Sequence, residues 1–164
     1  MFINRYIFLF LFCFVVNIDT SFAQNTFQQD LDLAILGNSG AEYRIGSRYL
    51  NGEGIEQDYT KALYWLEKAA AQNHANALYN LGYMYLYGYG VKTDYMMAFD
   101  YFESAKNLNF LPAYYIIGIM YYDGAGVKKN DKKAYEYCKI AIENGYKTSN
   151  ITLDHENKKI IINK

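Results

Sequence analysis

From Ala41 onward the sequence repeats itself every 36 residues. Each of three copies starts with an alanine, followed two positions later by a tyrosine and five positions later by a glycine. A Gly-x-Gly element and a second apolar block follow in every copy. A fixed period of this length indicates that each copy is one supersecondary unit and that the units stack in a row. The corresponding positions are Ala41, Ala77 and Ala113; Gly52/Gly54, Gly88/Gly90 and Gly124/Gly126; and Ala62, Ala98 and Ala134.

Each copy is predicted to form two antiparallel helices. In the second copy, Ala77, Leu81 and Tyr85 are spaced by four residues and therefore share one helical face. The Gly-x-Gly element ends this helix, because glycine adopts a positive φ at little steric cost. One helix pair cannot bury both of its faces, so neighbouring pairs must stack. We therefore predict an all-α fold, an α/α solenoid of antiparallel helix pairs. Residues suited to cap the second helix are Asp58, Asp94 and Asn130.

The first copy resembles the Sel1-like repeat, an α/α unit related to the tetratricopeptide repeat. The resemblance implies three repeats over residues 41–76, 77–112 and 113–147, preceded by a half-repeat or cap helix over residues 24–40. It also implies a scaffold for protein complexes rather than an enzyme, since this is what the family mainly provides. The matching residues are Ala41, Ile45-Gly46, Tyr49, Gly52-x-Gly54-Ile55, Asp58, Lys61-Ala62, Trp65 and Lys68-Ala69-Ala70.

The repeat pattern fades after Tyr146. Residues 148–164 contain no Gly-x-Gly element and end in a mixture of lysines and isoleucines. We expect this segment to be either a polar-faced capping helix or a frayed tail.

The amino-terminal segment has the three parts of a secretory signal peptide. Arg5 gives a positive start, residues 6–16 are apolar, and Ser21-Phe22-Ala23 offers small residues at a cleavage site. An apolar helix of 11 residues spans about 16 Å, roughly half of a bilayer core. We expect residues 1–23 to be removed, leaving an exported chain, periplasmic or secreted, with no membrane span. The alternative is an uncleaved membrane anchor.

The net charge of −1 conceals an uneven distribution of charge. Residues 24–127 contain six basic and eleven acidic residues, whereas residues 128–164 contain nine basic and five acidic ones. The lysines at the start of the second segment could favour an anionic partner, although a solvated loop is the simpler interpretation. The overall balance gives no reason to expect nucleic acid as a partner. These lysines are Lys128, Lys129, Lys132 and Lys133.

The sequence offers no arrangement typical of catalysis, metal binding or a cofactor. The two histidines, His74 and His155, have no metal-ligand spacing, and the chain contains no Ser-x-x-Lys motif. Cys138 stands where the other copies have Leu66 and Phe102, so we expect a buried, inert thiol. We therefore predict that the chain is not an enzyme and that it needs no metal or cofactor. The alternative is a cell-envelope accessory related to peptidoglycan, or a β-lactamase-like enzyme.

A row of tyrosines lies off the core-facing side of the first helices. In the second copy the row is Tyr79, Tyr83 and Tyr87, spaced by four residues. Tyrosine is common where proteins bind one another, which indicates a partner-binding surface. The alternative is that these rings only pack between helices. We expect an exported scaffold that binds a protein or peptide on the concave surface of its first helices. The candidate binding residues are Tyr43, Tyr79, Tyr83, Tyr87, Tyr115 and Ile119.

Overall fold

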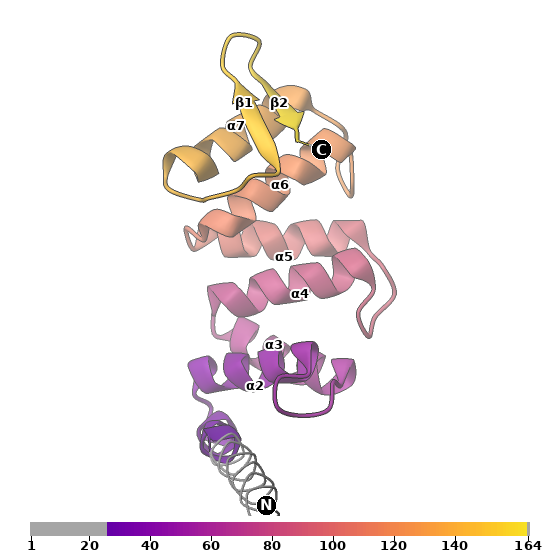
Figure 1. Ribbon diagram of the computed structural model, residues 1–164. Helices are drawn as coiled ribbons and strands as arrows, with labels where there is room; N and C mark the ends of the chain where they lie inside the picture. Colours follow the sequence, from indigo (N-terminus) through magenta and orange to yellow (C-terminus); the bar gives the residue numbers. More distant parts are fainter. Residues whose placement is uncertain (1–25, 164) are drawn as a thin grey trace, which may run out of the picture.

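The computed structural model describes residues 26–163, which form a row of stacked helices ending in a two-stranded antiparallel sheet (Figure 1). The predicted signal peptide, residues 1–23, lies outside the described residues, as do residues 24 and 25 of the expected half-repeat. The elements are α1 (26–35), α2 (Ser39–Asn51), α3 (Tyr59–Ala71), α4 (Ala75–Tyr87), α5 (Tyr95–Asn107), α6 (Leu111–Asp123), α7 (Asp131–Glu143), β1 (Ile151–Asp154) and β2 (Lys159–Ile162).

The C-cap of the first helix and the N-cap of the second helix lie at the same positions in every repeat. The first helix of each pair ends at a glycine with a positive φ, such as Gly88 with a φ of 75°. The N–H of Gly88 donates to the carbonyl oxygen of Met84, which satisfies one of the carbonyl groups left open at a helix end. The second helix starts after an acidic or amide cap, and the Asp94 carboxylate accepts from the N–H groups of Met96 and Met97.

Helix pairs pack closely where a glycine of the first helix faces a large side chain of the second. A Cβ placed on Gly82 would lie 2.6 Å from Cε1 of Phe102, far inside van der Waals contact. Gly46 has the same relation to Leu66, where a Cβ would lie 2.8 Å from Cγ. These glycines therefore determine how closely the two helices of a pair approach.

The core continues from one repeat into the next. Buried side chains of α3, including Leu66, pack with buried side chains of α4, including Leu81 and Met84. Every helix pair thus covers an apolar face of its neighbour, as a stacked repeat requires. The predicted all-α solenoid of antiparallel helix pairs is confirmed.

Helix α1 lies where a preceding half-repeat is expected. Its Ala34 is fully buried against Ala41 and Ile45 of α2, with Phe27 and Leu31 packed beside them. At the C-terminal end of α1, by contrast, the side chains of Ile35 and Leu36 are largely exposed. None of the helices within residues 26–163 has the length and apolarity needed to cross a membrane.

The C-terminal segment is neither the capping helix nor the frayed tail expected for residues 148–164. It is a β-hairpin in which Ile151 pairs with Ile162 and Asp154 with Lys159. β-branched residues are frequent in both strands and favour extended backbone. The Asp154 carboxylate closes the turn by accepting from the backbone and side-chain N–H groups of Asn157.

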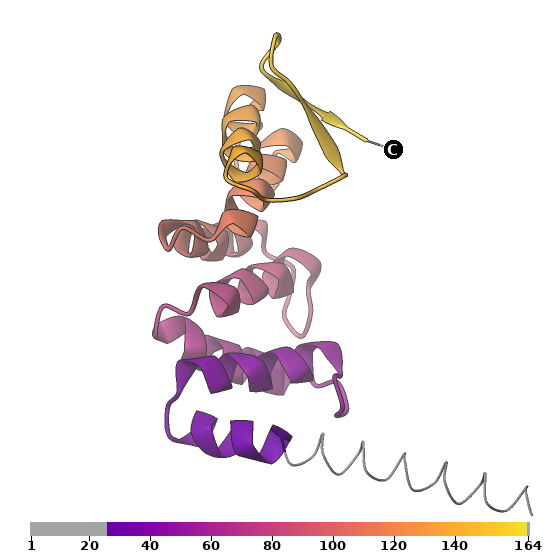
Figure 2. The same ribbon diagram turned by 60° about the vertical axis from the view of Figure 1, so that its left-hand side comes forward.

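The hairpin covers the end of the solenoid on the side of α7 (Figure 2). Ile151 and Ile160 are buried against Tyr115, Cys138 and Ala141. A hairpin can do this with two side chains because strand residues alternate between faces, and Ile161 accordingly remains exposed. The apolar face of the last repeat is thus covered without a further helix.

Replacing Gly82 by alanine is expected to lower the free energy of unfolding by about 1–3 kcal/mol, because the added methyl group would overlap Phe102. Gly40→Ala is the matched control, since a Cβ on this helical glycine would meet no atom closer than 3.4 Å. That change should leave the free energy of unfolding unchanged or raise it by up to about 1 kcal/mol through better helix propensity. Urea denaturation followed by circular dichroism measures both. Equal destabilisation by the two changes would contradict the role given to Gly82.

Candidate binding surface

The tyrosines of α4 belong to a continuous series of ring contacts. Tyr79 meets Tyr83 edge to face with ring centroids 4.9 Å apart, and Tyr83 stacks on Tyr87 at 5.7 Å. Tyr87 in turn stacks on Tyr89 at 5.7 Å, and Tyr89 on Tyr59 at 5.4 Å. The series therefore runs from the middle of α4, over the Gly-x-Gly turn, to the start of α3.

The inner tyrosines of this series contribute to both packing and surface. Tyr79 and Tyr83 are half-buried, and each has its ring centroid 5.5 Å from that of Phe102. Their hydroxyl oxygens lie 3.2 Å apart, within hydrogen-bond distance. Burial raises the pKa of Tyr79 and of Tyr83 above the ordinary value, so both phenols stay protonated at neutral pH. Tyr87, by contrast, is 58% exposed.

The other predicted binding residues have different surroundings. Tyr43 is half-buried and stacks on His74 with ring centroids 4.7 Å apart. Tyr115 is only 6% exposed and packs on Tyr146 in the core next to the hairpin. Tyr115 therefore offers a partner little surface in this structure, since it is buried in the same apolar cluster as Ile151 and Ile160 of the hairpin. Ile119 is half-buried and lines an open groove.

Two grooves open on the surface formed by the first helices α2, α4 and α6, which we call the first-helix surface. The first groove, of about 480 Å³, lies between repeats one and two. The second groove, of about 520 Å³, lies between repeats two and three. The first is lined by Leu50, Asn51, Gln57, Tyr59, Tyr79, Asn80, Tyr83 and Tyr89. The second is lined by Leu86, Tyr87, Tyr95, Ile116, Ile119, Met120, Asp123, Gly124 and Ala125.

The two grooves are the same feature in successive repeats. Six residues of the first groove have a counterpart 36 positions later in the second. The chemistry nevertheless differs, since the first groove contains three amide side chains and the second contains none. The pairs are Leu50/Leu86, Asn51/Tyr87, Tyr59/Tyr95, Asn80/Ile116, Tyr83/Ile119 and Tyr89/Ala125.

Residues outside the first helices complete both grooves, and the sequence analysis did not name them. Tyr59 and Tyr95 stand at the first position of α3 and α5, directly after the capping aspartates. Tyr89 comes from the Gly-x-Gly turn of the second repeat. The signal for Tyr59 and Tyr95 in the sequence is an aromatic residue at the same repeat position in two copies, whereas Tyr89 has no aromatic counterpart. Only the fold shows that this position faces the neighbouring first helix.

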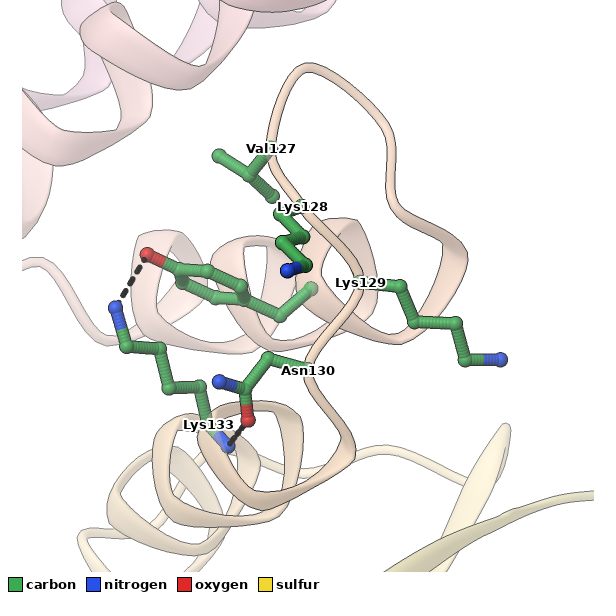
Figure 3. Close-up of a pocket in the computed structure, with 6 residues that line it drawn as sticks. Val127, Lys128, Lys129, Asn130 and Lys133 are labelled. Atoms are coloured by element: carbon green, nitrogen blue, oxygen red, sulfur yellow. Dashed lines mark hydrogen bonds between the residues drawn. The ribbon is translucent and has the colours of Figure 1, made fainter.

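The lysine-rich loop before α7 forms a separate pocket of about 460 Å³ (Figure 3). Lys133 Nζ donates to the hydroxyl of Tyr121 at 3.2 Å and lies 4.8 Å from the centroid of that ring. Lys129 points away from the pocket and lies 3.9 Å from the Asp131 carboxylate. Lys132 does not line the pocket. The lysines therefore do not converge on one point, which favours the solvated-loop interpretation.

The histidines and the cysteine lie apart from one another. His74 caps the start of α4, and desolvation lowers its pKa below the ordinary value. His155 Nδ1 is 2.9 Å from the hydroxyl of Tyr135 in the hairpin region. Cys138 is fully buried, so the prediction of a core thiol is confirmed. Within residues 26–163 no group of three or more His, Cys, Asp or Glu side chains is arranged to hold a metal ion.

Burial raises the pKa of the Cys138 thiol to about 12, so we expect it to resist alkylation in the folded chain at pH 8. Iodoacetamide labelling followed by mass spectrometry should show modification only after denaturation. Because deprotonation requires a pH near 12, raising the pH from 7 to 9 should leave native labelling negligible. Rapid labelling of the folded chain at pH 8 would contradict a buried, inert thiol.

Comparison with known proteins places this fold in a family. The Sel1 repeat family profile matches residues 39–74, 75–110 and 111–146, starting two residues earlier than the predicted repeats. No curated protein matches the sequence.

Several solved structures are similar to the chain. A Sel1 repeat protein from Oxalobacter formigenes is 34% identical with a TM-score of 0.72, and the match covers 76% of this chain and 49% of that one. The protective antigen c5321 of uropathogenic Escherichia coli is 32% identical with a TM-score of 0.70, over 73% of this chain and 26% of that one. Cysteine rich protein B of Helicobacter pylori is 27% identical with a TM-score of 0.60, over 73% of this chain and 89% of that one.

The chain thus spans about half the length of the Oxalobacter protein and about a quarter of that of the E. coli antigen. The family match itself covers well over half of the 164 residues. The helix-pair solenoid and the three matched repeats together show that the chain belongs to the Sel1 repeat family.

Proposed function

We propose that this chain is an exported scaffold that binds a protein or peptide partner on its first-helix surface, the concave side of the solenoid. The observation that carries the proposal is the recurrence of one groove in successive repeats, with the exposed ring of Tyr87 lining the second copy. The Sel1 repeat fold is typical of protein–protein interaction, which supports a macromolecular partner.

The side chains around Tyr87 suit binding of a protein. Tyr89 and Tyr95 are 40% and 50% exposed, so three large rings meet solvent within a short distance along the chain. Tyrosine has few rotatable bonds, so a partner that covers it gains apolar contact at a small loss of side-chain entropy. The stacking of Tyr87 on both Tyr83 and Tyr89 further fixes its ring before a partner arrives.

Replacing Tyr87 and Ile119 together, as Tyr87→Ala and Ile119→Ser, is expected to weaken partner binding at least tenfold, because residues in the centre of an interface carry most of the binding energy. The full chain and the variant would be immobilised and challenged with the exported proteins of its source cell. Retained proteins are then quantified by mass spectrometry, with affinities measured for those retained.

The control variant is Tyr64→Ala, since Tyr64 is a tyrosine of similar exposure (53%) on α3 that lines neither groove. It should retain the same proteins as the unmodified chain. Circular dichroism verifies that all variants keep their helices. Unchanged retention by the double variant would contradict the proposed surface.

Export is the second part of the proposal, and the segment Met1–Ala23 supports it. The full-length coding sequence expressed in a bacterial host should yield a periplasmic or secreted chain whose intact mass starts at Gln24. Ala23→Leu should block cleavage, because a signal peptidase needs a small residue at this position. A native mass that starts at Met1 would contradict cleavage, and a cytoplasmic chain would contradict export.

A further inference from the structure

The second groove has apolar walls and one charged residue at its end. Leu86 and Tyr87 of α4 form one wall, and Ile116 and Ile119 of α6 form the other. The remaining side chains are aromatic, aliphatic or methionine, except for Asp123 at the end of α6. Such a groove accommodates an apolar side chain of a ligand and places the next residue of that ligand beside the Asp123 carboxylate.

Asp123 lacks a partner within residues 26–163. It is exposed, and among residues 26–163 it forms neither an ion pair nor a side-chain hydrogen bond. It is also the last residue of α6, where the partial negative charge of the helix end disfavours an acid. Its counterparts in the other repeats, Asn51 and Tyr87, are neutral. A cation at this point would interact favourably with both the carboxylate and the helix end.

The charge that lines the second groove favours a cationic ligand. No lysine or arginine lines either groove. Residues 24–127, which supply all of the groove residues, contain eleven acidic and six basic residues. The Asp123 carboxylate in the second groove therefore attracts positively charged segments and repels acidic ones.

The first groove offers groups that suit the backbone of an extended peptide. The amide of Asn80 is half-buried and makes no side-chain hydrogen bond within residues 26–163. Asn51 donates to Glu53 Oε1 at 2.9 Å, and Gln57 donates to the carbonyl oxygen of Leu50 at 2.7 Å. The carbonyl oxygens of these two amides therefore remain available as acceptors for peptide N–H groups.

We propose that the second groove binds a peptide segment in which an apolar side chain is followed by lysine or arginine. The apolar side chain lies between Tyr87, Tyr95 and Ile119, and the cation lies at Asp123. The neighbouring backbone extends into the first groove toward Asn80. This inference rests on the proposed function and names the chemistry of the partner that the first-helix surface accepts.

In the test, a display library of random peptides of about twelve residues is selected for binding to the full chain. The selected peptides should be enriched in an aliphatic or aromatic residue adjacent to lysine or arginine. A synthetic copy of the best binder and a second copy with its cation replaced by glutamate are then titrated by fluorescence anisotropy. We expect Asp123→Lys to weaken the cationic peptide about fivefold or more, the upper range for an exposed ion pair, and to strengthen the glutamate peptide.

Asp100→Lys is the matched control, because Asp100 is an exposed acid on α5 that lines neither groove. It makes the same change in net charge and should alter the affinity of either peptide less than twofold. If net charge alone were responsible, both variants would change the peptide affinities by the same factor. That result would overturn the assignment of Asp123.

The remaining outcomes separate the two proposals. Binders that depend on Tyr87 and Ile119 but show no preference for a cation would overturn the present inference and leave the proposed function standing. Binders that are indifferent to Tyr87→Ala and Ile119→Ser, or a selection that yields no binder, would contradict both.

Discussion

The close approach of two helices at a glycine sets the geometry of each repeat. Gly82 lies against Phe102 and Gly46 against Leu66, with no room for a methyl group at either glycine. Because these contacts recur at one position of the repeat, successive helix pairs have the same internal spacing. The grooves between neighbouring first helices recur for the same reason. A change that separates the two helices of a pair therefore also displaces the walls of the binding surface.

Positions that vary among the repeats give this regular surface its chemistry. Asn80 lines the first groove, and its counterpart Ile116 lines the second. Asn51, Tyr87 and Asp123 occupy one position of three successive repeats and offer an amide, a ring and a carboxylate. The shared residues hold the helices together, so these variable positions are free to differ and would set the partner preference of the proposed surface.

Within residues 26–163 the helix pairs are held together by the packing of their side chains. Its relative from Helicobacter pylori is described as cysteine-rich, whereas this chain contains two cysteines, of which Cys138 is a buried free thiol. Cys138 lies at the position that Phe102 and Leu66 occupy in the other repeats, facing Gly118. A cysteine at this place acts as a small core side chain.

The sequence by itself determined the helix pairs, their order and their stacking, because those depend on local signals repeated every 36 residues: capping aspartates, positive-φ glycines and small residues at fixed spacing. It also identified Tyr79, Tyr83 and Tyr87 as one face of a helix. The hairpin escaped prediction because its burial depends on Ile151 and Ile160 packing against the last helix pair, a tertiary contact that the 36-residue repeat pattern does not encode. For the same reason, only the tertiary structure decided that Tyr115 is covered while Tyr59 and Tyr95 line grooves: exposure depends on which element lies across each ring.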